Sequence, residues 1–417
     1  MAASNTVIVG AGIIGLSTAY YLARHQQAST IHLVEVSPEL FASASGYAAG
    51  FLARDWFGPG VSSLGALSFD EHKRLAKAYD GANRWGYQRS TAVSYNPGPR
   101  RENTSTRGAD HLRTGESRAT AAHNAQSSEM TNELTPSWLR RRAGDSMSVI
   151  GDEGSTAQLD PLRLCRFLLD ECLQQGVQLH HPAKVTAVLT DTRNELSSVT
   201  IADTTSSTET DVPCTKLIIA AGAWSAQVFA ELFPKTSSTL PISGLAGHSL
   251  VVRSPQWTEK MSGCHAVFTT SRAGYSPEVF SRTGGEIWIG GLNSSAIPLP
   301  QTATERVILA EAIAQLKEDA DLLLGYGEEV EDGDLKIVRE GLCFRPVTPY
   351  GTPIISRIDD EHLGGDIATR PNADGGVYLA AGHGPWGISL SLGTGKVLAE
   401  MVQARRTSAD MSSLVMW

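Results

Sequence analysis

Residues 7–36 read VIVGAGIIGLSTAYYLARHQQASTIHLVEV, and they carry the strongest structural signal in the chain. It begins as a β-branched strand, passes through a glycine-rich turn and continues as a helix-forming run to Arg24. A second strand is expected from about Thr30, ending at Glu35. A strand, a glycine turn, a helix and a second strand in this order form the first unit of a dinucleotide-binding domain.

The three glycines of the turn have different roles in such a unit. Gly10 permits the tight turn, Gly12 lets the backbone approach a pyrophosphate, and Gly15 lets the helix pack closely on the sheet. The helix N-terminus offers N–H groups and a positive dipole end to that pyrophosphate. Glu35 follows Gly15 at the spacing of about twenty residues where an acid hydrogen-bonds an adenosine ribose. An acid here favours an unphosphorylated ribose and argues against NADP.

The composition is that of a globular protein, and it narrows the possible partners. The 417 residues allow one large domain or two, and 41% of them are hydrophobic against 19% charged. The formal net charge of −9 argues against a nucleic-acid partner, and no apolar run is long enough to span a bilayer. Five scattered cysteines and a first strand too early for a signal peptide predict a cytoplasmic location.

The order of segments predicts an α/β protein with two interleaved domains. A discontinuous, Rossmann-like cofactor domain would carry an inserted, mostly antiparallel α+β substrate domain. The cofactor domain is expected to comprise residues 1–90, 151–239 and 336–417. The substrate domain is expected to comprise residues 91–150 and 240–335.

Two further segments have an unusual composition. Residues 96–145 are polar and without periodicity, so they are expected to form a mobile surface insertion. Residues 42–53 read ASASGYAAGFLA, which predicts a flexible loop rich in backbone donors. Such a loop, placed after the second strand, could lie against a pyrophosphate or a flavin ring.

Other helices and strands follow from local signals. A helix is expected from Leu159 with Asp160 as its N-cap, and a long amphipathic helix over roughly residues 304–324. Residues 177–190 predict a strand pair. His180 and His181 adjoin these strands without matching ligands elsewhere, so no metal site is expected.

Separated blocks of the chain resemble one group of enzymes, the flavin-dependent amine oxidases of the glycine oxidase, D-amino-acid oxidase and sarcosine oxidase group. The blocks are VIVGAGIIGLSTAYYLA, SASGYAAGFLA, LIIAAGAWSAQVF, GLCFRPVTPYGTPIIS and VYLAAGHGPWGISLSLGTG. Together they cover most of the chain outside residues 96–145. Within the group the chain is similar to a little-characterised fungal branch related to an oxidoreductase implicated in endosomal trafficking, so a peripheral endosomal association is also expected.

The resemblance implies FAD rather than NAD, held along the Rossmann-like domain. It also implies that the C-terminal helix points its N-terminus at the pyrimidine end of the flavin, where the dipole stabilises negative charge. The residues expected to contact the cofactor are Gly10, Gly12, Ile13, Ile14, Gly15, Glu35, Val36, Ser43, Ser45, Gly46, Ala49, Gly50, Val185, Ala221, Gly222, Trp224, Cys343, Arg345, Gly382, His383, Gly384, Trp386, Gly387, Ile388 and Thr394.

The resemblance also assigns catalytic candidates. Arg345 matches the family arginine that clamps the substrate carboxylate, and such a bidentate pair would hold the Cα–H close to the flavin. His383 and Trp386 are expected near the flavin. The family tyrosine that covers the substrate aligns near Glu278, with Tyr275 three residues away, and a carboxylate here would repel an ordinary amino acid or receive an amine.

Cys343 falls where the sarcosine oxidase branch carries the cysteine that is bonded to the flavin 8-methyl carbon. Other relatives bind FAD without a covalent bond. Non-covalent FAD is therefore the expectation here, with a bond to Cys343 as the alternative.

The sequence thus predicts an FAD-dependent oxidoreductase that oxidises the C–N bond of a small amino acid or N-substituted amine by hydride transfer to flavin N5. Electrons would pass to O2 or to another acceptor. The alternative is a flavin-binding protein with a trafficking or scaffold role and little turnover. An NAD-dependent dehydrogenase is disfavoured by the C-terminal block.

Overall fold

The fold is taken from a computed structural model of the chain. It describes residues 5–98, 136–255, 257–258, 263–271, 273–324 and 335–416. Most of the expected insertion, residues 99–135, therefore lies outside the described residues.

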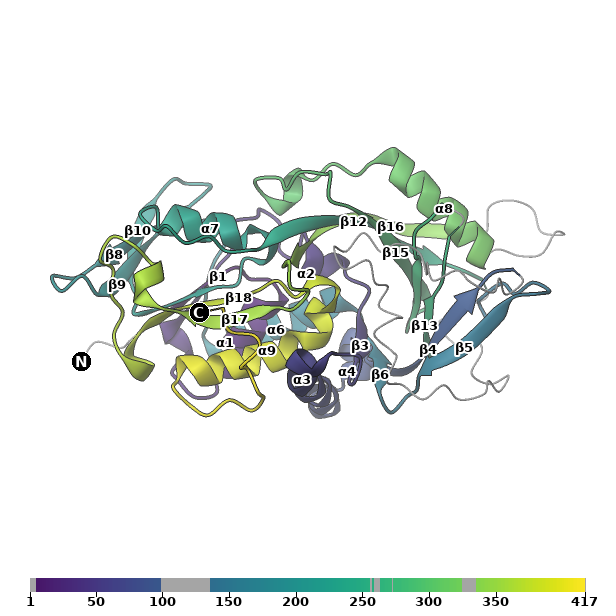
Figure 1. Cartoon of the computed structure of the whole chain (residues 1–417), viewed down its shortest axis with the longest axis horizontal. Helices are drawn as coiled ribbons and strands as arrows, with labels where there is room; N and C mark the ends of the chain where they lie inside the picture. Colours follow the sequence, from purple (N-terminus) through teal and green to yellow (C-terminus); the bar gives the residue numbers. More distant parts are fainter. Residues whose placement is uncertain are drawn as a thin grey trace.

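A six-stranded sheet forms the centre of one half of the molecule (Figure 1). Its strands, in spatial order, are β17 (Ile354–Ile358), β18 (Gly376–Ala381), β11 (Lys216–Ile219), β1 (Thr6–Val9), β2 (Ile31–Val34) and β7 (Gln178–His180). All neighbours are parallel except β17 and β18. Because these strands come from the start, the middle and the end of the chain, the sheet closes only when three distant segments meet.

Helices cover one face of this sheet, and a smaller sheet with one helix covers the other. The helical layer contains α1 (Ile13–Leu22), α3 (Pro59–Ala78), α4 (Gly81–Trp85), α6 (Pro161–Gln175) and α9 (Gly387–Val402). Alternate strand residues such as Ile8 and Ile218 pack against these helices. The intervening residues, such as Val7 and Leu217, pack against the opposite layer. Strands that are buried on both faces in this way have sequences of consecutive apolar residues.

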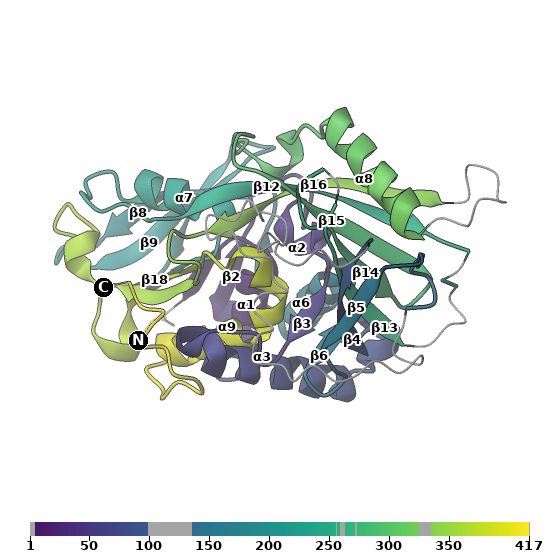
Figure 2. The same cartoon turned by 45° about the vertical axis from the view of Figure 1, so that its right-hand side comes forward.

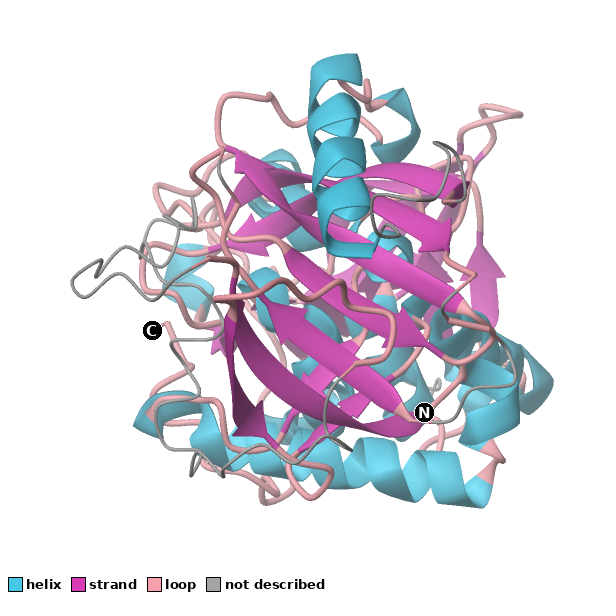
Figure 3. Cartoon of the chain, turned by 90° about the vertical axis from the view of Figure 1, so that its right-hand side faces the viewer, coloured by secondary structure: helices cyan, strands magenta, loops and turns pink. Residues whose placement is uncertain are grey.

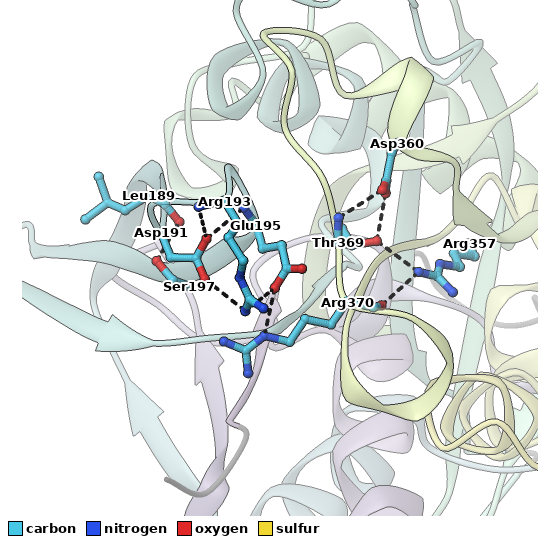
Figure 4. Close-up of polar contacts among 9 residues, drawn as sticks. All are labelled: Leu189, Asp191, Arg193, Glu195, Ser197, Arg357, Asp360, Thr369 and Arg370. Atoms are coloured by element: carbon cyan, nitrogen blue, oxygen red, sulfur yellow. Dashed lines mark hydrogen bonds and ion pairs between the residues drawn. The ribbon is translucent and has the colours of Figure 1, made fainter. Parts of the chain in front are cut away.

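The opposite layer consists of α7 (Ser225–Leu232) and the three-stranded sheet of β10 (Glu209–Pro213), β9 (Leu196–Asp203) and β8 (Ala183–Thr190). Polar contacts tie this sheet to the segment after β17 (Figure 4). Arg193 and Arg370 both pair with Glu195, at 2.7 and 3.5 Å. Arg357 donates to the hydroxyl of Thr369. The pair of Arg370 and Glu195 joins the segment to the residue before β9 across more than a hundred residues of sequence, and the other contacts order the two partners locally.

A nine-stranded, mostly antiparallel sheet forms the other half of the molecule. Its strands are β16 (Lys336–Val347), β12 (Ser243–Arg253), β15 (Glu286–Ser294), β14 (Glu278–Arg282), β13 (Cys264–Phe268), β4 (Gln88–Asn96), β6 (Thr156–Gln158) and β3 (Phe51–Ala53), with β5 (Ser146–Gly151) paired to β4. Helix α8 (Ala310–Leu324) lies across its outer face (Figures 2 and 3). Leu250 and Ile289 pack under that helix. Val251 and Trp288, one residue along each strand, face the other side.

Four local expectations need correction. Residues 42–53 are not a loop, since they contain the helical turn α2 (Ala44–Tyr47) and strand β3. The strands β7 and β8 follow each other but belong to different sheets, because the chain changes layer at the His181–Pro182 bond. Helix α8 begins at Ala310, after a separate 3-10 turn, rather than near residue 304.

The fourth correction concerns the C-terminal end of the expected insertion. Trp138 is fully buried and Leu139 almost so, and both pack in the core under α8. The description of residues 96–145 as a mobile surface insertion was therefore wrong for this end. Two neighbouring apolar residues in a polar segment were too weak a signal to predict that this end packs in the core.

Candidate active site

A cavity of about 550 Å³ lies between the two large sheets. It begins at the carboxyl ends of β1, β2 and β11, where ligands bind in open α/β sheets. It then follows α2, β12, β16 and the first residues of α9. The expected cofactor residues that line it are Gly10, Gly12, Ile13, Ile14, Glu35, Val36, Ser43, Ser45, Ala49, Gly50, Val185, Ala221, Gly222, Trp224, Cys343, Arg345, His383, Gly384, Gly387 and Ile388.

The first turn of α1 opens into this cavity. Gly12 is the N-cap residue and has no side chain of its own to cap the helix. A Cβ atom at Gly12 would lie 3.0 Å from the Ser45 hydroxyl oxygen, which accepts the Ile13 N–H at 2.9 Å. Gly15 lies behind the turn, where a Cβ atom would be 2.0 Å from the Gly10 carbonyl oxygen. The helix can therefore meet the turn closely only with glycine at position 15.

Glu35 stands at the end of β2 with both carboxylate oxygens oriented by backbone amides. One oxygen accepts the Ala11 N–H at 3.1 Å, and the other accepts the Ser37 N–H at 2.9 Å. Each carboxylate oxygen can accept a further hydrogen bond. A ribose hydroxyl in the cavity can therefore be bound without moving the side chain.

A second helix N-terminus approaches the cavity from the C-terminal turn. Helix α9 begins at Gly387 after a 3-10 turn, and no side chain caps it. His383, in that turn, is buried, and its Nε2 lies 3.1 Å from the Thr394 hydroxyl. Burial lowers the pKa of His383 to about 3, so the ring is neutral. Its Nδ1 is buried and has no hydrogen-bond partner among the described residues.

Strand β16 supplies the other wall. Cys343 and Arg345 lie on the same face of the strand, and Cys343 is paired with Gly247 of β12. A Cβ atom at Gly247 would be 3.2 Å from the Arg345 guanidinium carbon, so this glycine makes room for the side chain. Arg345 donates to the side-chain oxygen of Asn293 on β15. Arg345 is therefore held from the sheet side and presented to the cavity.

Sequence reasoning missed Tyr47, which lines the cavity from α2. The guanidinium carbons of Arg306 and Arg339 each lie 4.6 Å from the centre of its ring. Arg306 also donates to its hydroxyl, and the Trp288 ring N–H donates to its carbonyl at 3.1 Å. No sequence signal links these four residues, because they come from four separate segments.

Other expected residues lie away from the cavity surface. Tyr275 is buried, and its hydroxyl donates to Asp319 of α8 on the far side of the sheet. Glu278 is buried on β14 and does not line the cavity. Their placement gives no support for a role at the substrate. Gly15, Gly46, Gly382, Trp386 and Thr394 form the layer behind the cavity wall, where Thr394 contacts His383 and Trp386 packs on Phe57 with ring centres 4.9 Å apart.

The donors present fit a flavin nucleotide. The N-termini of α1 and α9, whose N-cap residues provide no capping side chain, suit a pyrophosphate and a polarised ring oxygen, and the oriented Glu35 suits a ribose. The cavity also has the size of a cofactor site. A groove that joins the first βα turn of a Rossmann-like domain to a second helix N-terminus under an antiparallel sheet defines a flavin-dependent oxidoreductase.

Comparison with known proteins agrees with this class. The family described as FAD dependent oxidoreductase (DAO) matches residues 5–401, and the chain belongs to this family. The protein C1F5.03c of Schizosaccharomyces pombe, which carries the provisional name of an oxidoreductase, is 30% identical over 98% of this chain and 97% of its own length. TDA3 of Saccharomyces cerevisiae, provisionally named in the same way, is 25% identical over 98% of this chain and 93% of its own.

Glycine oxidase from Geobacillus kaustophilus shares the fold, with a TM-score of 0.71 and 21% identity over 99% of this chain and 97% of that one. FAD is thus the cofactor, as the resemblance implied. In the part of the chain that the structure describes, no three His, Cys, Asp or Glu side chains gather in a way that could hold a metal ion. Nor is any helix there long and apolar enough to cross a membrane.

The start of α9 depends on His72 of α3, which leads to a pH prediction. His72 is fully buried, and its Nε2 lies 2.9 Å from the Ile388 carbonyl oxygen. Burial lowers its pKa to about 4, whereas an unfolded histidine titrates near 6.5. The unfolded chain therefore takes up the proton first as the pH falls. Stability is full above pH 6.5 and declines between about 6.5 and 4, by about 2 kcal/mol from this group at pH 5.

Urea unfolding of the wild type and of His72→Gln at pH 7 and pH 5 measures this effect. The variant should be less stable at pH 7 but should lose less stability on going to pH 5. An equal loss in both proteins would show that His72 does not titrate in this way.

Proposed function

We propose that the protein oxidises the C–N bond of a small amino acid or N-substituted amine that carries a carboxylate. The observation that carries this proposal is the placement of Arg345. Its side chain lines the cavity, it is anchored by Asn293, and no carboxylate lies within 4.0 Å of it among the described residues. A guanidinium in this position suits a substrate carboxylate, which it can bind through two parallel hydrogen bonds.

The residues of the chain would contribute orientation and electrostatics. Bound FAD supplies the two-electron acceptor that takes a hydride from the substrate carbon. Arg345 fixes the carboxylate and therefore the direction of the Cα–H bond. The nearby guanidinium groups disfavour an ammonium, so the substrate amine reacts in its neutral form. The N-terminus of α9 stabilises negative charge that develops on the ring.

His383 acts as a neutral group in this scheme. Because burial lowers its pKa to about 3, its ring carries a single N–H and no positive charge at neutral pH. Its contact with Thr394 fixes the turn that begins α9. We therefore assign it a positioning role and expect no acid–base step through it.

The alternative of a scaffold with little turnover is not favoured, since the family and the built cavity are those of an oxidoreductase. The identity of the electron acceptor, the cytoplasmic location and the endosomal association stay predictions.

The direct test is anaerobic reduction of the bound flavin by a panel of glycine, sarcosine, D-amino acids and glycated amines. We expect loss of the yellow absorbance with at least one carboxylated amine and none with the corresponding decarboxylated amine. A flavin that no member of the panel reduces would contradict the proposal.

The state of the flavin linkage is a separate prediction. Burial raises the pKa of the Cys343 thiol, although Arg345, Arg306 and Arg339 oppose that shift. Since the thiolate is the nucleophile, a covalent bond to the flavin is disfavoured. We expect acid precipitation to leave the yellow colour in the supernatant, and Cys343→Ser to keep FAD equally well. A yellow pellet from the wild type, lost in Cys343→Ser, would establish the bond instead.

A further inference from the structure

Three arginines, Arg345, Arg306 and Arg339, stand near Cys343, and Arg345 lines the cavity itself. Burial raises the pKa of the Cys343 thiol, and the three guanidinium groups oppose this shift, although each of the arginines is only half-buried. None of the three lies within 4.0 Å of a carboxylate in the described ranges. A substrate with one acid, bound at Arg345, would leave two of these charges uncompensated. Arg306 and Arg339 are half-buried, and an anion close to them gains from their positive charge.

The register of β16 explains how these groups share one wall. Arg339, Gly341, Cys343 and Arg345 alternate along the strand and lie on one face. A Cβ atom at Gly341 would be 2.5 Å from the ring of Tyr47, so the tyrosine occupies the place of the missing side chain. Tyr47, which lies over Gly341, and Arg345 thus stand on either side of Cys343. Gly341 and Arg345 are four residues apart on β16, which is about 13 Å along the strand. The Arg345 guanidinium lies beside Gly247, which is paired with Cys343, so the side chain leans along the strand toward Tyr47 and the span between the two polar groups is shorter than this.

Tyr47 has the right hydrogen-bonding capacity for an anion. Its hydroxyl accepts from Arg306, so its own hydrogen can be donated into the cavity. Arg306 also donates to the Ala303 carbonyl at 2.9 Å, while Arg339 donates to the Gly46 carbonyl at 3.1 Å. Both arginines are therefore held by backbone carbonyls with their guanidinium groups against the Tyr47 ring, where they supply positive charge beside the phenol.

We propose that Tyr47, backed by Arg306 and Arg339, forms a second anion subsite, and that the substrate is an amino acid or N-substituted amine with two acidic groups. This inference rests on the proposed function, because Arg345 binds the first carboxylate. Tyr47 acts as a specificity-determining residue, and Arg306 and Arg339 act through it. One acid at Arg345 and a second at Tyr47 would leave the amine and its carbon between them.

Binding of unreactive acids tests the subsite independently of turnover. Butyrate and glutarate differ by one carboxylate, and their dissociation constants can be measured from the perturbation of the oxidised flavin spectrum in the holoenzyme. We expect glutarate to bind about ten- to a hundredfold more tightly, the range for one charge-assisted hydrogen bond. Tyr47→Phe and Arg306→Gln should reduce this ratio to near one and leave butyrate unaffected, whereas Arg306→Lys should restore part of it.

Matched controls use groups outside the cavity. Tyr350→Phe and Arg253→Gln change exposed side chains and should keep the full ratio. Equal binding of the two acids by the wild type, or a spectrum that neither acid perturbs, would overturn the subsite. So would variants at Tyr47 and Arg306 that weaken both acids alike.

Reduction by sarcosine and iminodiacetate separates this inference from the proposed function. The two amines share one carboxymethyl group, and iminodiacetate carries a second in place of the methyl. Faster reduction at low concentration by iminodiacetate, lost in Tyr47→Phe, supports the diacid preference. Reduction by sarcosine alone would overturn it and leave the proposed function intact. If no amine reduces the flavin, the proposed function fails, and the ratio for the two unreactive acids still decides the subsite.

Discussion

Gly12→Val should yield a folded but colourless protein. Gly12 has an extended backbone, with φ −69°, which valine adopts without strain. The added side chain would fill the space in front of the first turn of α1 and press on Ser45. Since two charge-assisted hydrogen bonds of about 1.5–3 kcal/mol each would be lost, we expect FAD binding to weaken by roughly a hundredfold or more. The ratio of flavin absorbance to protein absorbance after purification measures the loss.

Gly58 provides a matched control for this experiment. It is also the N-cap residue of a helix, α3, with φ −62°, and a Cβ atom there would meet nothing within 4 Å. Gly58→Val should therefore remain yellow, with an unfolding midpoint like that of the wild type. If Gly12→Val retains a full complement of FAD, the pyrophosphate does not lie at this turn.

Arg345→Leu should keep FAD but lose reduction by carboxylated substrates. Leucine retains much of the apolar stem, while the charge and the five donors disappear. Removal of one partner of a desolvated ion pair costs about 3–5 kcal/mol, so we expect kcat/KM to fall by roughly two to four orders of magnitude. Anaerobic stopped-flow reduction of the bound flavin gives this quantity without involving the electron acceptor.

The interpretation requires that the variant change only the carboxylate contact. Arg357→Leu is a suitable comparison, because Arg357 is also half-buried and hydrogen-bonded but lies on β17 among the contacts shown in Figure 4. Its rate of reduction should match that of the wild type. Full reduction of Arg345→Leu by the same amine would place the substrate carboxylate elsewhere.

Most residues that the sequence assigned to the cofactor line the cavity, because the signals that identify them are local. Gly10, Gly12 and Gly15 act within one turn, and Glu35 is positioned by the strand that follows. The turn from β18 to α9 is equally local, and His383 and Gly387 reach the cavity as expected. Family resemblance added Arg345, which no spacing rule would have identified.

The part of the site proposed to bind substrate was harder to predict, because its residues come together only through the pairing of distant strands. Tyr47 meets Arg306 and Arg339 only after β16 is paired with β12 and α2 is packed on Gly341. Conversely, the substrate-covering tyrosine was expected near Tyr275 and Glu278. The hydroxyl of Tyr275 instead donates to Asp319 of α8, on the other side of the sheet. A shift of one residue along a strand exchanges its two faces, and no local signal fixes that choice.

The central sheet also determines when the protein can acquire its cofactor during synthesis. Strand β11 is flanked by β1 and by β18, and the latter is among the last strands to be made. Until β18 and α9 have emerged from the ribosome, one edge of β11 is unpaired and one wall of the nucleotide groove is missing. Loading of FAD is therefore a late event in biogenesis, and a chain truncated before residue 376 would expose an apolar edge prone to aggregation.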